Sequence, residues 1–311
     1  MIKVCFLGTP EFAAVHLRSL ITNSDYSVVG VVTQPDRPAG RKMQLAPSAV
    51  KTVALDNKLP YLTPENLRKQ PELFEEIKAW HADIAVVVAF GQILNQEFLD
   101  HFKFGAVNVH GSLLPRWRGA APIQRAIEAG DLETGVCLQK IVKKLDAGPL
   151  VGERRIKIEN DMTATHLYDR LAVMGCDLLK TDLLDYVKGN KTPIVQDETR
   201  VTIAAKIEKE ESLINWEISA DLIHNKVRAF SMGPGTYCVF QDKRLKILKT
   251  KVVDAAQTGK AGSVVQVNSE NLVLQTGLGH LALIEVQPES KPKIAIKDFL
   301  NNYKLKTGDI F

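Results

Sequence analysis

Short apolar runs alternate with amphipathic stretches along the first part of this 311-residue chain. The apolar runs are rich in β-branched residues, which favours strands over Ile2–Leu7, Val28–Thr33, Ile84–Ala89 and Ala106–Val109. Between them the apolar spacing predicts helices over Phe12–Ile21, Ser48–Asn57 and Pro71–Ala79. Such alternation is typical of a parallel sheet covered on both faces, so we expect an α/β domain with a Rossmann-like sheet.

A longer amphipathic stretch ends this part of the chain. Residues Thr163–Val187 predict one long helix, which Gly189 terminates. Its apolar residues fall near one stripe, and they are Leu167, Leu171, Met174, Leu178 and Val187. The polar residues that follow, beginning Gly189-Asn-Lys-Thr-Pro193, predict an interdomain linker over 190–205 after a first domain of residues 1–189.

The remaining residues, 206–311, predict a second and smaller domain. A helix is expected over Ser219–Phe230. Five strands are then expected over Thr236–Phe240, Leu245–Val252, Gly262–Val267, Leu272–Gln275 and Leu281–Val286. So many short strands in so little sequence indicate a small β-barrel of the OB-like type.

The net charge of +4, from 40 basic and 36 acidic residues, is unevenly distributed. Residues 206–311 hold 15 basic and 12 acidic residues, a net +3, so the first 205 residues hold 25 and 24, a net +1. Within the smaller domain, residues 226–260 carry eight Lys or Arg against only Asp242 and Asp254. This local excess is compatible with RNA backbone binding, although ordinary exposed lysines would give the same pattern.

Composition excludes several classes of protein. With 45% hydrophobic and 24% charged residues the chain resembles neither a disordered nor a collagen-like protein. No stretch approaches the roughly 18 apolar residues of a membrane span, and no signal peptide opens the sequence, so we expect a cytoplasmic protein without a membrane partner. The four cysteines are widely scattered, which argues for reduced thiols and against a metal site.

The loop after the first predicted strand lacks nucleotide-binding chemistry. Gly8-Thr-Pro10 stands where a dinucleotide-binding protein carries three glycines, and it offers one glycine followed by a proline. The sheet is therefore expected to be Rossmann-like in shape without a pyrophosphate cradle.

The most informative polar residues lie on the fourth predicted strand. Asn108 and His110 are two positions apart, so they share one face near the carboxyl end of the strand, where open α/β sheets bind ligands. An amide donor beside an imidazole suits a reaction through a tetrahedral oxyanion. The alternative is a pair of hydrogen-bonded polar residues at a strand end, without chemistry.

Asp146 lies in a turn between two further strand-like runs, Val136–Val142 and Leu150–Ile158. A carboxylate near His110 would orient the imidazole and favour its charged form. Asp and Gly are also ordinary turn residues, so Asp146 alone is better explained by the turn.

These residues carry a resemblance to a known family. Asn108-x-His110-x-Ser112-Leu-Leu-Pro115, followed by Asp146, resembles the folate-dependent formyltransferases, and most closely those that act on methionyl-tRNA. Further segments that look like this family are Phe6–Ala13, Thr33–Arg41, Val107–Gln124, Gly130–Gly135 and Gln196–Thr199. The most specific of these resemblances are the Trp117–Pro122 extension and the Gln34–Arg41 loop. The resemblance covers almost the whole chain. It implies a Rossmann-like formyltransferase domain followed by an OB-like domain that helps to hold tRNA.

The resemblance also implies a reaction and its residues. A formyl group would pass from 10-formyltetrahydrofolate, the donor cosubstrate, to the amino group of initiator methionyl-tRNA, leaving tetrahydrofolate, with no metal and with the protein acting as a monomer. The catalytic residues implied are Asn108, His110 and Asp146. The implied folate-binding residues are Ser112, Leu113, Leu114, Pro115, Phe90, Gly91, Gln92 and Ile93, and the implied tRNA-binding cations are Arg37, Arg41 and Lys42.

Two other functions remain open from the sequence. One is a formyltransferase acting on a small amine, such as glycinamide ribonucleotide or a nucleotide sugar; the smaller domain and the basic loop argue against the ribonucleotide. The other is a non-catalytic RNA-binding protein, which the presence of Asn108, His110 and Asp146 makes the weaker alternative.

Overall fold

The computed structural model describes residues 1–39, 43–253 and 259–311, which form two compact units. The first unit comprises Met1–Gly119, Glu133–Ile156 and Tyr168–Ile203. The second comprises Ala120–Leu132, Lys157–Leu167 and Ala204–Phe311. Most of the 190–205 stretch therefore belongs to the first unit.

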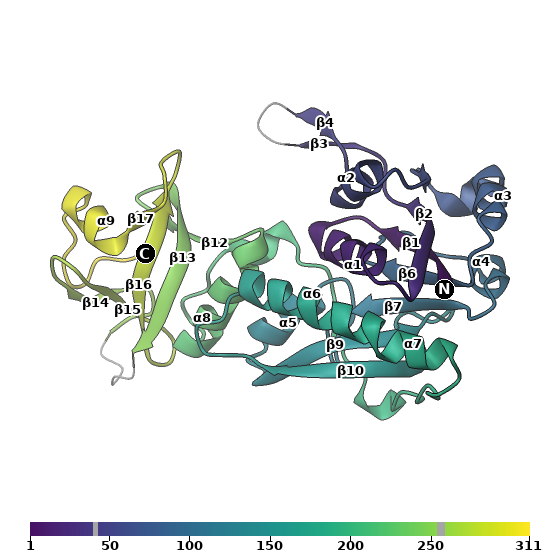
Figure 1. Ribbon diagram of the computed structural model, residues 1–311. Helices are drawn as coiled ribbons and strands as arrows, with labels where there is room; N and C mark the ends of the chain where they lie inside the picture. The colour runs from purple at the N-terminus through teal and green to yellow at the C-terminus, as the bar shows by residue number, and fades with distance from the viewer. Residues whose placement is uncertain (40–42, 254–258) are drawn as a thin grey trace. The chain divides into compact units, whose positions relative to one another are not determined.

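A seven-stranded sheet forms the centre of the first unit, in the order β10-β9-β7-β6-β1-β2-β5 (Figure 1). Its strands are β1 (Ile2–Gly8), β2 (Tyr26–Val32), β5 (Tyr61–Leu62), β6 (Ile84–Val88), β7 (Ala106–His110), β9 (Glu133–Lys140) and β10 (Leu150–Lys157). The five strands from β7 to β5 are mutually parallel, which confirms the predicted fold class. In contrast, β9 pairs antiparallel with β7. Strand direction leaves the hydrophobic pattern unchanged, so the sequence could not reveal this reversal.

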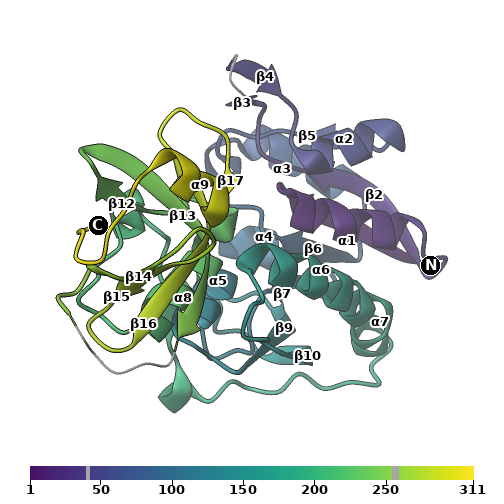
Figure 2. The same ribbon diagram turned by 90° about the vertical axis from the view of Figure 1, so that its left-hand side faces the viewer.

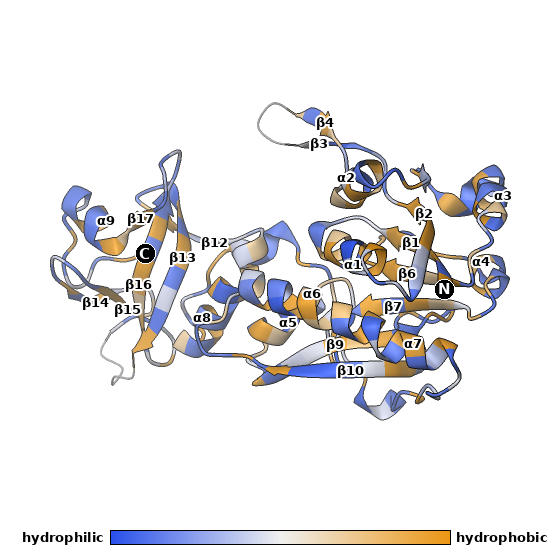
Figure 3. Cartoon of the chain, viewed as in Figure 1, coloured by the Kyte–Doolittle hydropathy of each residue, from blue (hydrophilic) through white to orange (hydrophobic). Residues whose placement is uncertain are grey.

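The helices of the first unit cover both faces of this sheet. They are α1 (Glu11–Ile21), α2 (Ala49–Asp56), α3 (Pro71–Ala79), α4 (Gln96–His101), α6 (Ala164–Lys180, its first turn in the second unit) and α7 (Asp182–Val187). On one face α1 and α6 lie side by side (Figures 1 and 2), because Gly175 of α6 leaves room for His16 of α1. On the other face Phe74 of α3 and Phe98 of α4 pack over Cys5, Ala85 and neighbouring strand residues. The central strands β1, β2 and β6 are accordingly the apolar part of the sheet (Figure 3).

The predicted helix over Thr163–Val187 is in fact two helices. α6 ends at Lys180, and α7 begins at Asp182. The break follows from Asp182, which is buried and contacts Arg154 of β10 at 2.7 Å and Lys191. The Thr181 hydroxyl donates to the Asp177 carbonyl oxygen at 2.8 Å and to the Asp182 carboxylate at the same distance. Long-range ion pairs thus interrupt a helix whose periodicity is continuous.

The second unit is built on an antiparallel sheet in the order β12-β13-β16-β15-β14, with β17 beside β16. Its strands are β12 (Thr236–Phe240), β13 (Lys243–Val253), β14 (Val264–Val267), β15 (Leu272–Gln275), β16 (His280–Pro288) and β17 (Ile294–Ala295). The helices are α5 (Pro122–Glu128), α8 (Ala220–Ala229) and α9 (Ile296–Asn302). Ile223 and Val227 of α8 join a core lined by the strands. The expected small, barrel-like β domain is therefore present.

Short elements complete the fold. They are the hairpin β3 (Arg37–Ala39) and β4 (Gln44–Ala46), the pair β8 (Arg118–Gly119) and β11 (Ile203–Ala204), and the single 3-10 turns Leu67–Lys69, Glu198–Arg200, Lys209–Ser212 and Phe230–Met232. Among the described residues, no helix has the length and apolar character required to span a bilayer.

Candidate active site

The strand order of the first unit creates a switch point between β1 and β6. The chain leaves β1 toward β2 and β5 and later returns to β6 on the opposite side of β1. In open α/β sheets, ligands bind at the carboxyl edge beside such a point. Three loops meet there, because the Thr9 hydroxyl after β1 and the Gln34 amide after β2 both donate to the Phe90 carbonyl oxygen after β6, at 3.2 and 3.1 Å.

The loop that follows β6 contains four residues implied in folate binding. Phe90 is buried, whereas Gly91 is exposed with a φ of 80°, a conformation that favours glycine. The Gln92 amide is engaged within the protein, accepting from the Leu67 N–H at 2.8 Å and donating to the Pro64 carbonyl oxygen at 2.8 Å. Ile93 is exposed. The loop is thus held by its own hydrogen bonds and presents Gly91 and Ile93 to solvent.

The next loop, after β7, contains the other four. The buried Ser112 hydroxyl donates to the Arg116 carbonyl oxygen at 2.7 Å, so this side chain holds the loop together. Leu113 packs against Gly135, where a Cβ would lie 2.5 Å from Leu113 Cδ2, and Leu114 is buried. Pro115 is half-buried. Because β6 and β7 are parallel neighbours, both loops leave the same edge of the sheet.

Asn108 and His110 share one face of β7, as predicted. In the antiparallel pairing of β7 with β9, Asn108 lies opposite Gln139 and His110 lies opposite Cys137. The Asn108 side chain is half-buried, and its amide makes no hydrogen bond to any residue that the structure describes. Burial raises the pKa of the Cys137 thiol to about 12, so this neighbour of His110 is a neutral thiol and not a nucleophile.

The structure brings His110 and Asp146 together, with 3.8 Å between His110 Nδ1 and Asp146 Oδ2. Both side chains are largely buried, with 7% and 13% of their surface exposed. His110 Nε2 lies 2.9 Å from the Trp117 carbonyl oxygen, and since a carbonyl can only accept, Nε2 carries the hydrogen. In the neutral ring Nδ1 is therefore the nitrogen without a hydrogen, and it faces the Asp146 carboxylate.

Asp146 is fixed in position by two hydrogen bonds to its carboxylate. Oδ2 accepts from the Gly119 N–H at 2.9 Å, and Oδ1 accepts from the Gln139 amide at 2.9 Å. The backbone at Asp146 is left-handed, with a φ of 46°, which costs about 1–3 kcal/mol for a residue other than glycine. Such a conformation persists only where surrounding contacts impose it.

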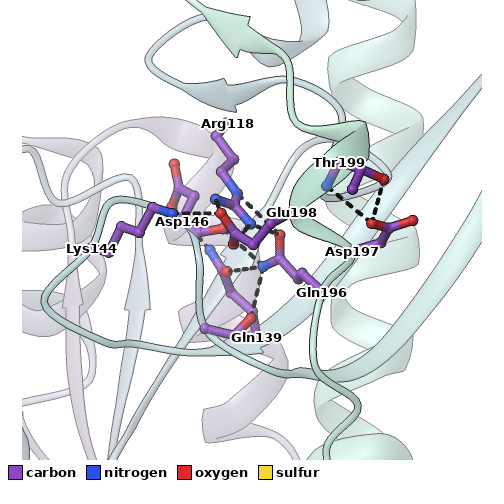
Figure 4. Close-up of polar contacts among 9 residues, drawn as sticks. Arg118, Gln139, Lys144, Asp146, Gln196, Asp197, Glu198 and Thr199 are labelled. Atoms are coloured by element: carbon purple, nitrogen blue, oxygen red, sulfur yellow. Dashed lines mark hydrogen bonds and ion pairs between the residues drawn. The ribbon is translucent and has the colours of Figure 1, made fainter.

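Four further residues surround this turn, and sequence reasoning assigned no chemical role to any of them (Figure 4). The Gln196 amide donates to the carbonyl oxygens of Asp146 and Gly148 at 2.8 and 2.7 Å. Its oxygen accepts from Arg118, a buried guanidinium that also contacts Glu198 at 2.7 Å. Hydrogen bonds from Arg118 and then Lys144 lower the pKa of Glu198 to about 2. The signals in the sequence were the family motifs Trp117–Pro122, which contains Arg118, and Gln196–Thr199.

Of the three predicted tRNA-binding cations, Arg37 lies among the residues that the structure describes. Arg37 begins strand β3 with an exposed side chain that lies 3.6 Å from Glu65 Oε2. Arg41 and Lys42 lie outside the described residues. All four cysteines are buried free thiols, and within the ranges that the structure describes no three His, Cys, Asp or Glu side chains are grouped to hold a metal.

Comparison with known proteins identifies the family. Residues 2–183 match the formyl transferase family, and residues 206–304 match the formyl transferase C-terminal domain. The chain is 57% identical to the methionyl-tRNA formyltransferase of Bdellovibrio bacteriovorus, covering 99% of this chain and 98% of that protein. It is 45% identical to the enzyme of the same name from Methylococcus capsulatus, covering 97% of both.

Solved structures with the same fold are more distant in sequence. A sugar 3N-formyl transferase, solved in the presence of dTDP and 5-N-formyl-THF, is 20% identical with a TM-score of 0.67, and the match covers 94% of this chain and 99% of that one. An N-formyltransferase from Helicobacter canadensis, solved with folinic acid and dTDP-3-aminofucose, is 19% identical with a TM-score of 0.68, over 93% and 100%. The chain belongs to the formyl transferase family, in the branch of the methionyl-tRNA formyltransferases.

Proposed function

We propose that this protein transfers the formyl group of 10-formyltetrahydrofolate to the amino group of initiator methionyl-tRNA. The proposal also assigns Asn108, His110 and Asp146 as the catalytic residues. The relatives that are 44–57% identical over nearly their whole length carry the name of this activity, whereas the sugar formyltransferases share only about a fifth of their residues with the chain. This difference favours the tRNA substrate over a small amine.

One observation carries the assignment of the site. Asp146 and His110 are both engaged by neighbouring groups, but the Asn108 amide beside them has no partner among the described residues. A half-buried amide that no protein group engages can donate to an acceptor that a ligand supplies. It is therefore available to an oxyanion that exists only during the reaction.

The reaction can be written with these groups. The neutral amine adds to the formyl carbon, and the carbonyl oxygen becomes an oxyanion that accepts a hydrogen bond from the Asn108 amide. One such preorganised donor contributes about 10²–10³-fold to the rate. As the new C–N bond forms, the amine loses a proton; as the bond from carbon to folate N10 breaks, N10 gains one. His110 Nδ1 carries this proton, and the Asp146 carboxylate stabilises the imidazolium that forms between the two steps.

The amine needs little activation. An α-amino group has a pKa near 7.7–8.0, so a useful fraction is already neutral at cellular pH. The enzyme therefore acts mainly by orienting the amine against the formyl carbon and by stabilising charge, which suits a site made of one amide, one imidazole and one carboxylate.

The folate donor would bind at the edge of the sheet from which the loops after β6 and β7 both leave. Gly91 would let the donor approach the backbone closely, and Ile93 offers exposed apolar surface to its ring system. The 112–115 segment would form the opposite side. The donor is a substrate that leaves as tetrahydrofolate, and the mechanism assigns no step to a metal.

The acceptor tRNA would be held by cations of each unit. In the first unit these are Arg37 and, by family resemblance, Arg41 and Lys42. In the second unit Arg244 of β13 stacks 3.9 Å from the centre of the Tyr237 ring of β12, and Lys246 lies opposite Tyr237 in the pairing. An arginine on an aromatic ring beside a lysine suits an RNA backbone. We further propose a catalytic domain of residues 1–189, a tRNA-binding domain of residues 206–311, a monomer, and a cytoplasmic location.

The decisive experiment offers the purified protein formylated folate with methionyl-tRNA, uncharged tRNA or small amines. We expect transfer to methionyl-tRNA alone. Asn108→Ala and His110→Ala should each lower kcat by about 10²–10³-fold, because each removes a group that acts on the transition state. The affinity for methionyl-tRNA, measured by filter binding, should stay within about threefold.

A matched control is His166→Ala, which removes an exposed histidine of α6. This variant should retain the parent's turnover. Transfer to a small amine with none to methionyl-tRNA would overturn the substrate, and His110→Ala turnover within a few-fold of the parent would overturn the assignment of the site.

A further inference from the structure

Residues 196–202, here called the 196–202 segment, lie outside both strands and helices except for one 3-10 turn at Glu198–Arg200. At its first residue the side chain of Gln196 is buried. Its amide nitrogen donates to the carbonyl oxygens of Asp146 and Gly148 and lies 3.2 Å from Gln139 Oε1 (Figure 4). Gln139 in turn donates to the Asp146 carboxylate. Gln196 therefore binds the backbone of the Asp146 turn, and it also contacts Gln139, which binds the Asp146 carboxylate.

At the other end, Thr202 holds the turn that orients His110. The Thr202 hydroxyl accepts from the Trp117 N–H at 2.8 Å, and the Thr202 backbone accepts from the Arg118 N–H at 2.9 Å. The Trp117 carbonyl oxygen then accepts from His110 Nε2. Thr202 is thus connected to the imidazole through the two peptide groups that flank Trp117.

The two turns are linked to each other through Arg118. Its guanidinium is buried and donates to the Gln196 oxygen at 2.8 Å and to Glu198 at 2.7 Å. The guanidinium belongs to the chain between Trp117 and Gly119, and the Gly119 N–H donates to Asp146. The 196–202 segment therefore fixes the distance between the two residues of the His110–Asp146 pair.

Both turns need such support because of their backbone conformation. Trp117 has a φ of 66° and Asp146 a φ of 46°, in the left-handed region that residues other than glycine adopt only under constraint. Each would relax toward an ordinary conformation if its hydrogen bonds were lost. Relaxation at Trp117 moves the carbonyl that holds His110, and relaxation at Asp146 moves the carboxylate.

We propose that Gln196 and Thr202 are positioning residues for formyl transfer, each fixing one member of the His110–Asp146 pair. This rests on the proposed catalytic roles of His110 and Asp146. In this proposal the segment acts through the geometry of the His110–Asp146 pair. A misplacement of about 1 Å in a catalytic pair can lower a rate about 100-fold while leaving substrate contacts intact.

The test compares isosteric substitutions in the full-length protein. Thr202→Val removes the hydroxyl and keeps the shape, whereas Thr202→Ser keeps the hydroxyl. We expect Thr202→Val to lower kcat about 10-fold or more, with the KM for formylated folate and for methionyl-tRNA within about twofold of the parent. Thr202→Ser should stay within about twofold of the parent. Gln196→Met, which removes all the polar contacts of Gln196, should lower kcat about 100-fold.

Thr199→Val is the control within the same segment. Its hydroxyl donates to Asp197 at 2.6 Å and contacts neither turn (Figure 4), so kcat should not change. A second measurement, the ¹⁵N chemical shifts of the His110 ring, should change in Thr202→Val and not in Thr199→Val. Equal kcat for Thr202→Val and Thr202→Ser, or an unchanged His110 spectrum in Thr202→Val, would overturn the inference.

These outcomes are separable from a failure of the proposed function. If the parent protein does not formylate methionyl-tRNA, the proposed function fails in that assay. The His110 spectrum needs no substrate, so it still supports or overturns the positioning of the imidazole by Thr202.

Discussion

His16 makes the stability of the first unit depend on pH in a range where carboxylates do not. The residue lies on α1, fully buried against Gly175 of α6. Its Nδ1 donates to the Phe12 carbonyl oxygen at 2.6 Å, and among the described residues Nε2 has no hydrogen-bond partner. Burial lowers the pKa of His16 from 6.5 to about 4, because a charged ring would leave a buried N–H unsatisfied.

The sign and the size of the effect follow from linkage. Between pH 6.5 and pH 4 the unfolded chain binds a proton at this residue and the folded chain does not, so stability falls as the pH falls. Between pH 7 and pH 5 these two pKa values correspond to a loss of about 2 kcal/mol in the free energy of unfolding. Carboxylates with a lowered pKa make stability depend on pH only at more acidic pH. Between pH 7 and pH 5 the dependence therefore comes from histidines.

The assay is urea unfolding of the parent and of His16→Leu at pH 7, 6 and 5 and constant ionic strength. Leucine fills a similar volume and does not titrate, so the variant should lose about 2 kcal/mol less than the parent over this range. Burial, and then the charge of Lys78, also lower the pKa of His101, but this contribution is common to both proteins and cancels. Stability curves that run parallel from pH 7 to pH 5 would refute the reasoning.

Three further predictions concern other parts of the molecule. Gly148→Ala should distort the Asp146 turn, because the added Cβ would lie 1.7 Å from the Lys140 carbonyl oxygen. We expect the free energy of unfolding, measured in urea, to fall by more than about 2 kcal/mol. Despite burial, which raises it, hydrogen bonds from Lys191, Thr181 and Arg154 lower the pKa of Asp182. Asp182→Asn should therefore lower the free energy of unfolding by about 2 kcal/mol at pH 7, a moderate loss because the partners Arg154 and Lys191 are half-exposed. Well below pH 3.8 the variant and the parent should be equally stable, because the parent's carboxylate is then protonated and has lost the same contribution. The affinity for methionyl-tRNA should fall steeply between 50 and 200 mM salt, and filter binding that shows no such slope would count against cationic recognition.

Local physical rules account for the elements that the sequence predicted accurately. The helix over Pro71–Ala79 begins with proline at its first position, where the missing N–H costs nothing, and the predicted bounds agree with α3. β12 was predicted over Thr236–Phe240 from alternation, and its burial alternates in the structure. The paired position of Asn108 and His110 on one face of β7 depends only on the two-residue repeat of a strand, so it too could be read directly.

The remaining features depend on contacts between residues far apart in the chain. Gln196 forms hydrogen bonds with Gln139 and Asp146, which are 57 and 50 residues away in the sequence. Thr202 forms one with Trp117, which is 85 residues away. No local sequence pattern encodes such pairs, so the polar residues near 196 predicted only a linker. The break between α6 and α7 has the same origin, since it depends on Asp182 reaching Arg154 of β10.

The location of these distant contacts explains why the strained turns persist. Left-handed backbone at Trp117 and Asp146 costs about 1–3 kcal/mol at each position. A typical hydrogen bond contributes about 0.5–1.5 kcal/mol, so several bonds together offset this cost where one bond is marginal. At Asp146 the carboxylate accepts two and the backbone carbonyl a third, and at Trp117 the N–H donates to Thr202 while the carbonyl accepts from His110. The Thr202 hydroxyl holds the N–H of the residue whose carbonyl holds the imidazole, so loss of that hydroxyl should be felt at His110.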